Sequence, residues 1–303
     1  MVTRRDFLRI GAAGAASLAL GEIACGDGKR KAGPGGEIHV GAKSFQEQLI
    51  LSALLDELIE KRTAATAKQT ILGGTNLCHK AILAGDIDCY VEYTGTAYTA
   101  ILKHYPISDA DAVYARVKAD YEKKFNLLWL PPLGFENTYA ILVRKTDAEK
   151  HNLRSISDLT RVVDSFRPGF GFEFFDRADG YRGLIKTYQL NFSKPPKQME
   201  LGLIYRAISA GEVDVIAGNS TDGQIAHLGL VMLTDDKHYF PPYDAAPVIR
   251  AEVAAAHPAA VEAIRSIAGT ISADRIRAAN YAVDSEHQAP KQVAAKLLAE
   301  ISP

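Results

Sequence analysis

The sequence is poor in the features that mark several classes of protein. Its 303 residues contain only three cysteines, Cys25, Cys78 and Cys89, and their spacing matches no zinc or redox motif. Lysine and arginine number 35 against 36 aspartates and glutamates, so the formal net charge is -1. A nearly neutral chain without a run of like charges gives no reason to expect nucleic acid as a partner. No apolar stretch reaches the roughly 20 residues that a membrane-spanning helix needs.

Catalytic signatures are missing as well. The sequence has no P-loop pattern, no G-x-G-x-x-G after a predicted strand, no H-E-x-x-H and no G-x-S-x-G. Its eight histidines are scattered without the spacing of metal ligands. We therefore expect no cofactor, no metal and no enzymatic activity.

The N-terminal segment Met1–Gly36 is predicted to be an export signal followed by a flexible tether. A twin-arginine-like start, TRRDFL, precedes the weakly apolar stretch GAAGAASLAL. Its glycines disfavour the alternative, a helix of the mature domain. Cys25 follows a small residue, as in lipoprotein processing sites, although Glu22 stands where those sites usually carry leucine. Lipidation at Cys25 stays open, so the protein is expected to be periplasmic or lipid-anchored at the outer face of the cytoplasmic membrane.

Two segments of the chain repeat one pattern at a constant offset of 126 residues. Residues 82–96 are ILAGDIDCYVEYTGT and residues 208–222 are ISAGEVDVIAGNSTD. Each predicts a helix end, a glycine cap, an acidic turn, a short strand and a polar loop. Chance similarity is the alternative, because this is a common way to join a helix to a strand. A true repeat predicts two lobes whose polar loops share one cleft, because ligands of open α/β sheets bind beyond the carboxyl ends of strands.

The remaining periodicity predicts an α/β fold with two lobes, each a mixed and mostly parallel sheet flanked by helices. Segments 137–143 and 243–249 are extended and apolar, and we interpret them as two hinge strands that join the lobes. The first lobe would comprise 37–138 plus 247–303, and the second 139–246. Strands are expected at 37–41, 87–91, 170–172 and 213–217, and helices at 45–61, 76–84, 180–189, 201–210 and within 250–303.

Tyrosines stand at strand ends and hinges. Tyr93 ends the first repeat, Tyr139 lies on the first crossing segment and Tyr243 begins the second. Tyrosine faces attract cations, and aromatic boxes recognise quaternary ammonium groups. The alternative is that each is a core aromatic with its hydroxyl at the surface.

A set of short motifs resembles one known family. In chain order the motifs are GAKSFQEQ at 41–48, LGGT at 72–75, EYTGT at 92–96, NTY at 137–139, EFFDR at 173–177, STDG at 220–223, DDKH at 235–238 and FPPY at 240–243. Together they resemble the substrate-binding proteins of osmoprotectant ABC importers, the glycine betaine/carnitine/choline-binding group. That resemblance implies a type 2 periplasmic binding-protein fold, and the motifs cover nearly the whole mature chain.

The resemblance also implies a binding site. Aromatic residues of this family box a trimethylammonium head, which assigns that role to Tyr93, Tyr139 and Tyr243. Lys43, Thr96 and Arg177 would face the anionic end of the ligand. Asn219 departs from the family, which often has tyrosine there, so one wall of the box is either missing or supplied by another aromatic residue such as Phe174 or Tyr181. The implied partners are a small zwitterionic or cationic solute and a membrane permease, with the binding protein acting as a monomer.

Several alternatives stay open. Asn219 could retune the site to a different trimethylammonium or amino-acid-like solute, because its amide brings both donors and acceptors. A bilobal enzyme would need a cleft carboxylate, for which Glu173 and Asp222 are the candidates. A ligand sensor that reports to a signalling partner is a third option. Cys78 and Cys89 are expected to be buried thiols, with a disulfide between them as the alternative.

Overall fold

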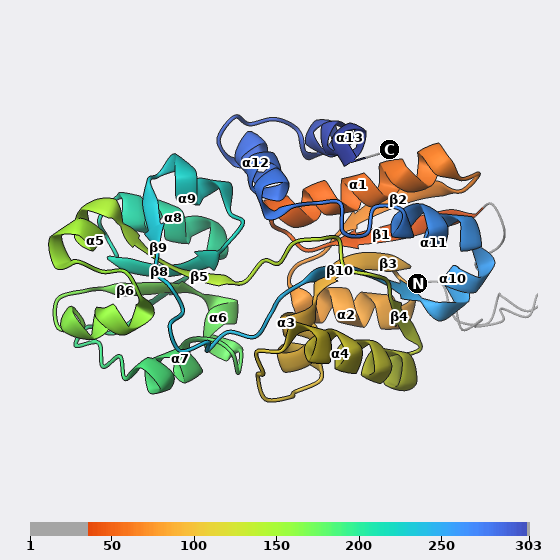
Figure 1. The fold of residues 1–303 in the computed structure, drawn as a ribbon. Helices are drawn as coiled ribbons and strands as arrows, with labels where there is room; N and C mark the ends of the chain where they lie inside the picture. Colours follow the sequence, from red (N-terminus) through yellow and green to blue (C-terminus); the bar gives the residue numbers. More distant parts are fainter. Residues whose placement is uncertain (1–35, 302–303) are drawn as a thin grey trace, which may run out of the picture. The chain divides into compact units, whose positions relative to one another are not determined.

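The computed structural model describes residues 36–301, which belong to one compact unit and form two five-stranded sheets (Figure 1). The first sheet has the strand order β2-β1-β3-β10-β4 and the second has the order β7-β6-β8-β5-β9. The first sheet comprises β1 (Glu37–Ala42), β2 (Thr66–Ile71), β3 (Cys89–Tyr93), β4 (Leu127–Trp129) and β10 (Ala245–Arg250). The second comprises β5 (Tyr139–Arg144), β6 (Pro168–Gly171), β7 (Lys197–Met199), β8 (Val215–Asn219) and β9 (Leu230–Met232).

The two sheets share one pairing pattern, in agreement with the repeated helix, strand and loop unit that the sequence predicted for two lobes. Strand β1 is parallel to β2 and β3, while β10 is antiparallel to β3 and β4. In the second sheet β6 is parallel to β7 and β8, while β5 is antiparallel to β8 and β9. The repeated strands β3 and β8 therefore occupy the same central place in their sheets. The two-lobed α/β fold is confirmed.

The repeated aspartates fix this pattern at the start of each central strand. Asp88 accepts a hydrogen bond from the backbone N–H of His39 at 2.8 Å and one from Arg250 at 3.2 Å. Asp214 likewise accepts from the backbone N–H of Arg167 at 2.9 Å, and it pairs with Arg144 at the end of β5. Each carboxylate thus ties a parallel neighbour and an antiparallel neighbour to the strand that it precedes.

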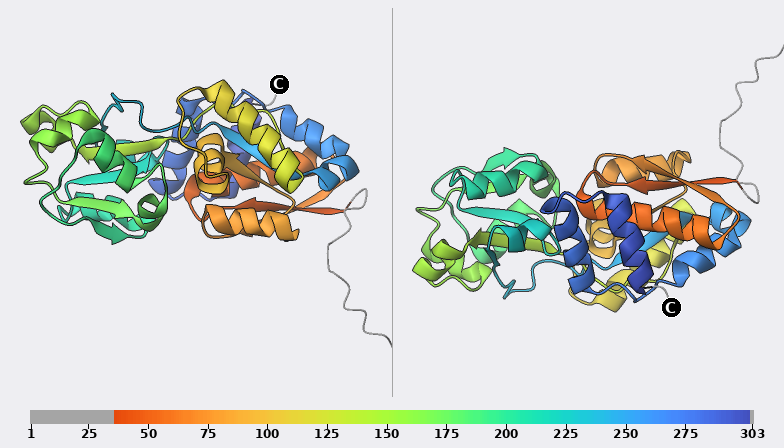
Figure 2. Two further views of the ribbon diagram at one scale, coloured as in Figure 1. Left: turned by 90° about the horizontal axis from the view of Figure 1, so that it is seen from below. Right: turned by 90° about the horizontal axis from the view of Figure 1, so that it is seen from above.

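Helices cover both faces of the first sheet, with α1, α11 and α13 on one side and α2 and α4 on the other (Figures 1 and 2). Around the first sheet lie α1 (Gln46–Arg62), α2 (Thr75–Ala84), α3 (Thr94–Thr96), the π-helical η1 (Ala97–Ile101), α4 (Ala110–Phe125), α10 (Ala251–Ala256), α11 (Pro258–Arg265), α12 (Ala273–Asp284) and α13 (Pro290–Ile301). Around the second lie α5 (Lys145–His151), the 3-10 helix η2 (Ile156–Arg161), α6 (Phe172–Asp176), α7 (Tyr181–Tyr188), α8 (Leu201–Ser209) and α9 (Gly223–His227).

Helix α1 forms where the apolar spacing predicted a helix, and its apolar residues are buried against the first sheet. Helix α2 also forms as predicted and ends at Gly85, which adopts a left-handed conformation with φ of 84°. Its start differs by one residue from the prediction. Gly74 takes the cap position and Thr75 is the first helical residue, without a side-chain cap hydrogen bond.

The two segments expected to cross between the lobes each run into a sheet strand. Segment 137–143 continues into β5 of the second sheet, and segment 243–249 into β10 of the first. The segments meet at their N-terminal ends, where Glu136 and Asp244 form an antiparallel bridge. The proposed lobe limits, 37–138 plus 247–303 and 139–246, stay a prediction. The predicted signal and tether, including Cys25, lie outside the described residues except for Gly36.

The C-terminal helices pack on the first lobe, and α12 also touches the second. Helices α11, α12 and α13 contact α1, and α12 contacts α9. A Cβ atom on Gly223, the first residue of α9, would lie 2.6 Å from the backbone of Tyr281 on α12. A glycine is therefore needed where these two helices meet.

Two further expectations concern the described residues. Cys78 and Cys89 are buried free thiols, as predicted from the sequence. Among residues 36–301, no helix is both long enough and apolar enough to cross a membrane.

Candidate functional site

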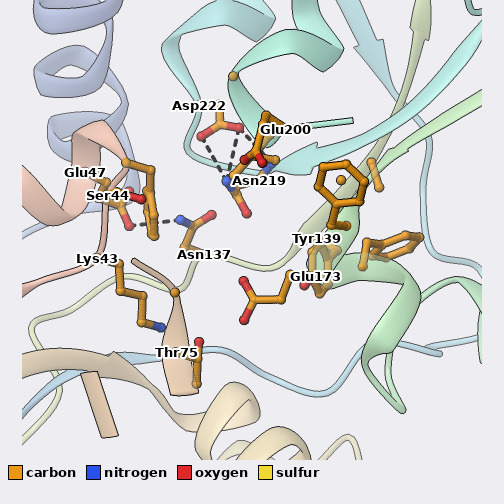
Figure 3. A pocket seen from close by; sticks show the side chains of 18 of the residues that line it. Lys43, Ser44, Glu47, Thr75, Asn137, Tyr139, Glu173, Glu200, Asn219 and Asp222 are labelled. Atoms are coloured by element: carbon orange, nitrogen blue, oxygen red, sulfur yellow. Dashed lines mark hydrogen bonds between the residues drawn. The ribbon is translucent and has the colours of Figure 1, made fainter. Parts of the chain in front are cut away.

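A cavity of about 1520 Å³ is lined by residues of both sheets and their loops (Figure 3). It lies where β1, β3, β6 and β8 end, at the carboxyl edges where ligands of open α/β sheets bind. All seven side chains that we assigned to a site line this cavity. They are Lys43, Tyr93, Thr96, Tyr139, Arg177, Asn219 and Tyr243. Their individual roles toward a ligand stay predictions.

Glu47 anchors one wall of the cavity. Its carboxylate accepts hydrogen bonds from Tyr93 Oη at 2.6 Å, Asn137 Nδ2 at 2.9 Å, Thr221 Oγ1 at 2.5 Å and Asn280 Nδ2 at 2.9 Å. These four donors come from the end of β3, the first crossing segment, the loop after β8 and helix α12. Burial raises the pKa of Glu47, and the hydrogen bonds oppose that shift. The network holds Tyr93 in place and links the two lobes.

Arg177 is held by a carboxylate of the protein itself. Its Nε and Nη2 atoms donate to Asp179 at 2.8 Å and 2.5 Å, a two-pronged pair in which both residues are buried. The guanidinium carbon also lies 5.4 Å from the ring centre of Tyr139 and 6.0 Å from that of Tyr243. Burial alone would raise the pKa of Asp179, but Arg177 and the hydroxyls of Tyr243 and Thr99 hold it below its usual range.

Lys43 follows the same arrangement at the end of β1. Its Nζ atom donates to Glu92 at 2.5 Å and lies 5.0 Å from the ring centre of Tyr93. Lys43 and Glu92 are both buried. Both basic residues expected to face an anionic ligand group are thus already paired, and both lie over the tyrosine rings of the site.

Aromatic side chains line several sides of the cavity. Tyr139 packs edge-on against Phe174, with ring centres 4.8 Å apart, and against Tyr243 at 5.9 Å. Of the two candidates for the missing wall, Phe174 lines the cavity. Tyr181 lies outside the lining and packs against Phe175 at 4.8 Å. Burial raises the pKa of Tyr139, so its phenol stays neutral at physiological pH.

Four further aromatic residues line the cavity without having been assigned to the site, namely Phe45, Phe172, Phe175 and Tyr205. Phe45 lies within the GAKSFQEQ motif, so the resemblance could have drawn attention to it. Tyr205 lies on α8, which the repeat predicted as a helix without indicating which side faces the cavity.

The side-chain amide of Asn219 is oriented by Asp222. Its Nδ2 atom donates to both carboxylate oxygens of Asp222 at 3.2 Å, and its backbone N–H donates at 2.9 Å. The hydroxyl of Tyr205 donates to the same carboxylate at 2.5 Å. Because Nδ2 faces Asp222, the carbonyl oxygen Oδ1 is the group that Asn219 turns toward the cavity (Figure 3). Burial raises the pKa of Asp222, and these hydrogen bonds oppose the shift.

Glu173 projects its carboxylate into the cavity from α6 (Figure 3). A Cβ atom on Gly74 of the other lobe would lie 3.6 Å from Glu173 Oε2. Within residues 36–301, no lysine or arginine forms an ion pair with Glu173. The same described range holds no group of three or more histidine, cysteine, aspartate or glutamate side chains arranged to bind a metal ion.

Comparisons with known proteins identify the family. Residues 36–300 match the family described as the substrate binding domain of the ABC-type glycine betaine transport system. The carnitine transport binding protein OpuCC of Listeria monocytogenes is 36% identical over 264 residues, which cover 86% of this chain and 85% of OpuCC. A crystal structure of a glycine betaine/carnitine/choline ABC transporter has a TM-score of 0.74 and 34% identity, and the match covers 87% of this chain and 98% of that chain.

A longer relative occurs in Helicobacter pylori. The ergothioneine transport permease/ergothioneine binding protein EgtU is 36% identical over 260 residues, which are 86% of this chain. This chain spans 46% of the length of EgtU. The family match over nearly all described residues, the relatives and the shared two-lobed fold agree with one another. The chain belongs to the family of substrate-binding domains of ABC-type glycine betaine transport systems and has the type 2 periplasmic binding-protein fold.

Proposed function

We propose that this protein is exported, binds a small quaternary-ammonium solute in the cavity between its lobes, and delivers it to an ABC permease. It acts as a monomer, either periplasmic or lipid-anchored through Cys25 at the outer face of the cytoplasmic membrane. Its ligand is glycine betaine or a related trimethylammonium compound, such as the carnitine or ergothioneine named for its relatives.

The observation that carries this proposal is that tyrosine faces in the cavity already attract cations. The side chains of Lys43 and Arg177 lie over the rings of Tyr93, Tyr139 and Tyr243 at 5.0 to 6.0 Å. Cation–π attraction is worth about 0.5–2 kcal/mol for each ring and increases as water is excluded. A trimethylammonium head entering this wall would meet the rings of Tyr93 and Tyr243, which are both buried.

Calorimetric titration of the 303-residue chain with glycine betaine, choline and carnitine tests the proposal. At least one of the three is expected to bind saturably. The variant Tyr139→Leu keeps an apolar side chain but removes the ring, and we expect about tenfold weaker binding. Absence of heat with all three solutes, in protein shown to be folded, would contradict the proposed function.

Tyr114→Leu is the matched control. Tyr114 is a half-buried tyrosine of α4 whose hydroxyl donates to the carbonyl of Leu130, and it does not line the cavity. Its replacement should leave the affinity unchanged. Equal losses of affinity in the two variants would show that Tyr139→Leu acts through stability, and the aromatic box would then lose its support.

A further inference from the structure

The buried cations and the hydrogen-bond acceptors of this cavity differ in whether the protein itself already provides them with a partner. Its two buried basic residues are paired with carboxylates of the protein, Lys43 with Glu92 and Arg177 with Asp179. Each cation therefore already has a full negative charge within 2.5 Å. A carboxylate of a ligand would have to compete with these partners, which are fixed by the fold.

Two acceptors, by contrast, have no such partner. Among the described residues no side chain or backbone group donates a hydrogen bond to the Glu173 carboxylate, which points into the cavity (Figure 3). The three other cations that line the cavity, Lys103, Arg182 and Arg206, are exposed, and none forms an ion pair with Glu173. A ligand that replaces the water around Glu173 would have to supply a donor or a positive charge.

Asn219 contributes the second acceptor, because Asp222 removes its freedom to flip. An isolated asparagine amide can present either its NH₂ or its oxygen. Here the NH₂ group is bound by both oxygens of Asp222, and the carboxylate is itself held by the Asn219 backbone N–H and by Tyr205. Reversing the amide would bring its oxygen against a carboxylate, so Oδ1 stays on the cavity side.

We propose that Glu173 and Asn219 Oδ1 form an acceptor subsite that selects quaternary-ammonium solutes carrying an O–H or N–H donor over solutes whose polar end is only a carboxylate. This inference rests on the proposed function and narrows its substrate class. The ligand's cationic head would meet the aromatic wall, and its donor would meet Glu173 and Asn219. A carboxylate in that place would face Glu173 at close range and would be repelled.

Choline and glycine betaine form a matched pair of probes, because both carry a trimethylammonium head and they differ in a hydroxymethyl against a carboxylate end. Calorimetry on the 303-residue chain should give a dissociation constant for choline at least about tenfold below that for glycine betaine. Glu173→Gln should weaken choline about fivefold or more and leave glycine betaine equal or tighter. Asn219→Ala should weaken choline and leave the binding of glycine betaine nearly unchanged.

Glu149→Gln is the control for net charge. It makes the same chemical change in the same lobe, on the exposed surface of α5 and away from the cavity, and should leave the ratio of the two dissociation constants unchanged. Thermal melting establishes that each variant is folded.

The outcomes separate this inference from the proposed function. If glycine betaine binds the native chain as tightly as choline does, or if Glu173→Gln leaves the ratio unchanged, the acceptor subsite is wrong while the proposed function stands. If choline, glycine betaine and carnitine all fail to bind, the proposed function itself is wrong.

Discussion

At the scale of single residues, the two buried cations of the site, Lys43 and Arg177, are already neutralised by carboxylates of the protein. Arg177 and Asp179 are 8% and 0% exposed, and the pair is joined by two short hydrogen bonds. Tyr243 also donates its hydroxyl to Asp179. A buried carboxylate that loses its cation keeps its full desolvation penalty. Removing Arg177 alone is therefore expected to destabilise the folded state by more than the intact ion pair stabilises it.

Replacing Arg177 with methionine is expected to lower the free energy of unfolding by about 3–5 kcal/mol, because Asp179 is then left buried without a cation. Urea denaturation at pH 7 measures the change. Arg206→Met is the control, since Arg206 lines the same cavity but is exposed and forms no ion pair with a described residue. A loss below about 1 kcal/mol in Arg177→Met would show that Asp179 finds another partner or water.

At the scale of elements, helix α1 carries one acid in an unfavourable place. Asp56 is a half-buried residue of α1, and its Oδ1 atom is buried without a hydrogen-bond partner among the described residues. Burial, and to a lesser degree Glu60 one turn along the helix, raise the pKa of Asp56 to about 7. The charged form is therefore disfavoured in the folded state.

This shift predicts how stability varies with pH. The folded pKa of about 7 lies above the unfolded value of about 3.9, so the contribution of Asp56 is most favourable below pH 4 and is lost as the pH rises to 7. Asp56→Asn should therefore raise the free energy of unfolding by about 1–2 kcal/mol at pH 8, after allowance for partial exposure, and leave it nearly unchanged at pH 4. Urea denaturation at both pH values tests this.

Glu57→Gln on the same helix is the comparison for Asp56→Asn. Glu57 forms an ion pair with Lys61 one turn away, in which the Lys61 side chain is 62% exposed and that of Glu57 15%, so its replacement should change stability by less than about 1 kcal/mol at either pH. A gain at pH 8 in both variants would point to net charge and not to burial of Asp56.

At the scale of the whole described unit, the lobes are tied together through Glu47. Its carboxylate receives donors from both lobes, from a crossing segment and from α12. Asn280 of α12 additionally donates to the carbonyl of Thr221 in the second lobe at 2.8 Å. Because the carboxylate is buried, these hydrogen bonds offset the free-energy cost of removing it from water. The loss of any one donor is therefore expected to destabilise the folded state.

Thr221→Val keeps the size of the side chain and removes its hydroxyl donor to Glu47. We expect the free energy of unfolding to fall by about 1–3 kcal/mol, because a buried carboxylate then lacks one of its hydrogen bonds. Thr221→Ser retains the hydroxyl and should recover most of the loss. Chemical denaturation of both variants measures the difference, and equal stability of Val and native protein would rule out an energetic role for this link.

The sequence by itself predicted the parts of the fold that depend on local pattern. Apolar spacing located α1 within one residue, Gly85 marked the end of α2, and the repeat at 82–96 and 208–222 predicted two lobes of one design. The predicted first residues of strands were less accurate, since β3 and β8 begin two residues later than expected. The family motifs also led to seven residues that line a single cavity.

Only the tertiary structure decided what those residues can offer a ligand. Lys43 meets Glu92 across 49 residues, and Glu47 meets Asn280 across 233. No periodicity, cap or turn signal reports such pairs, because they form only when distant segments pack together. The sequence therefore determined where the aromatic rings and charges lie along the chain. Packing determined which charges are neutralised and which acceptors, at Glu173 and Asn219, still face the cavity.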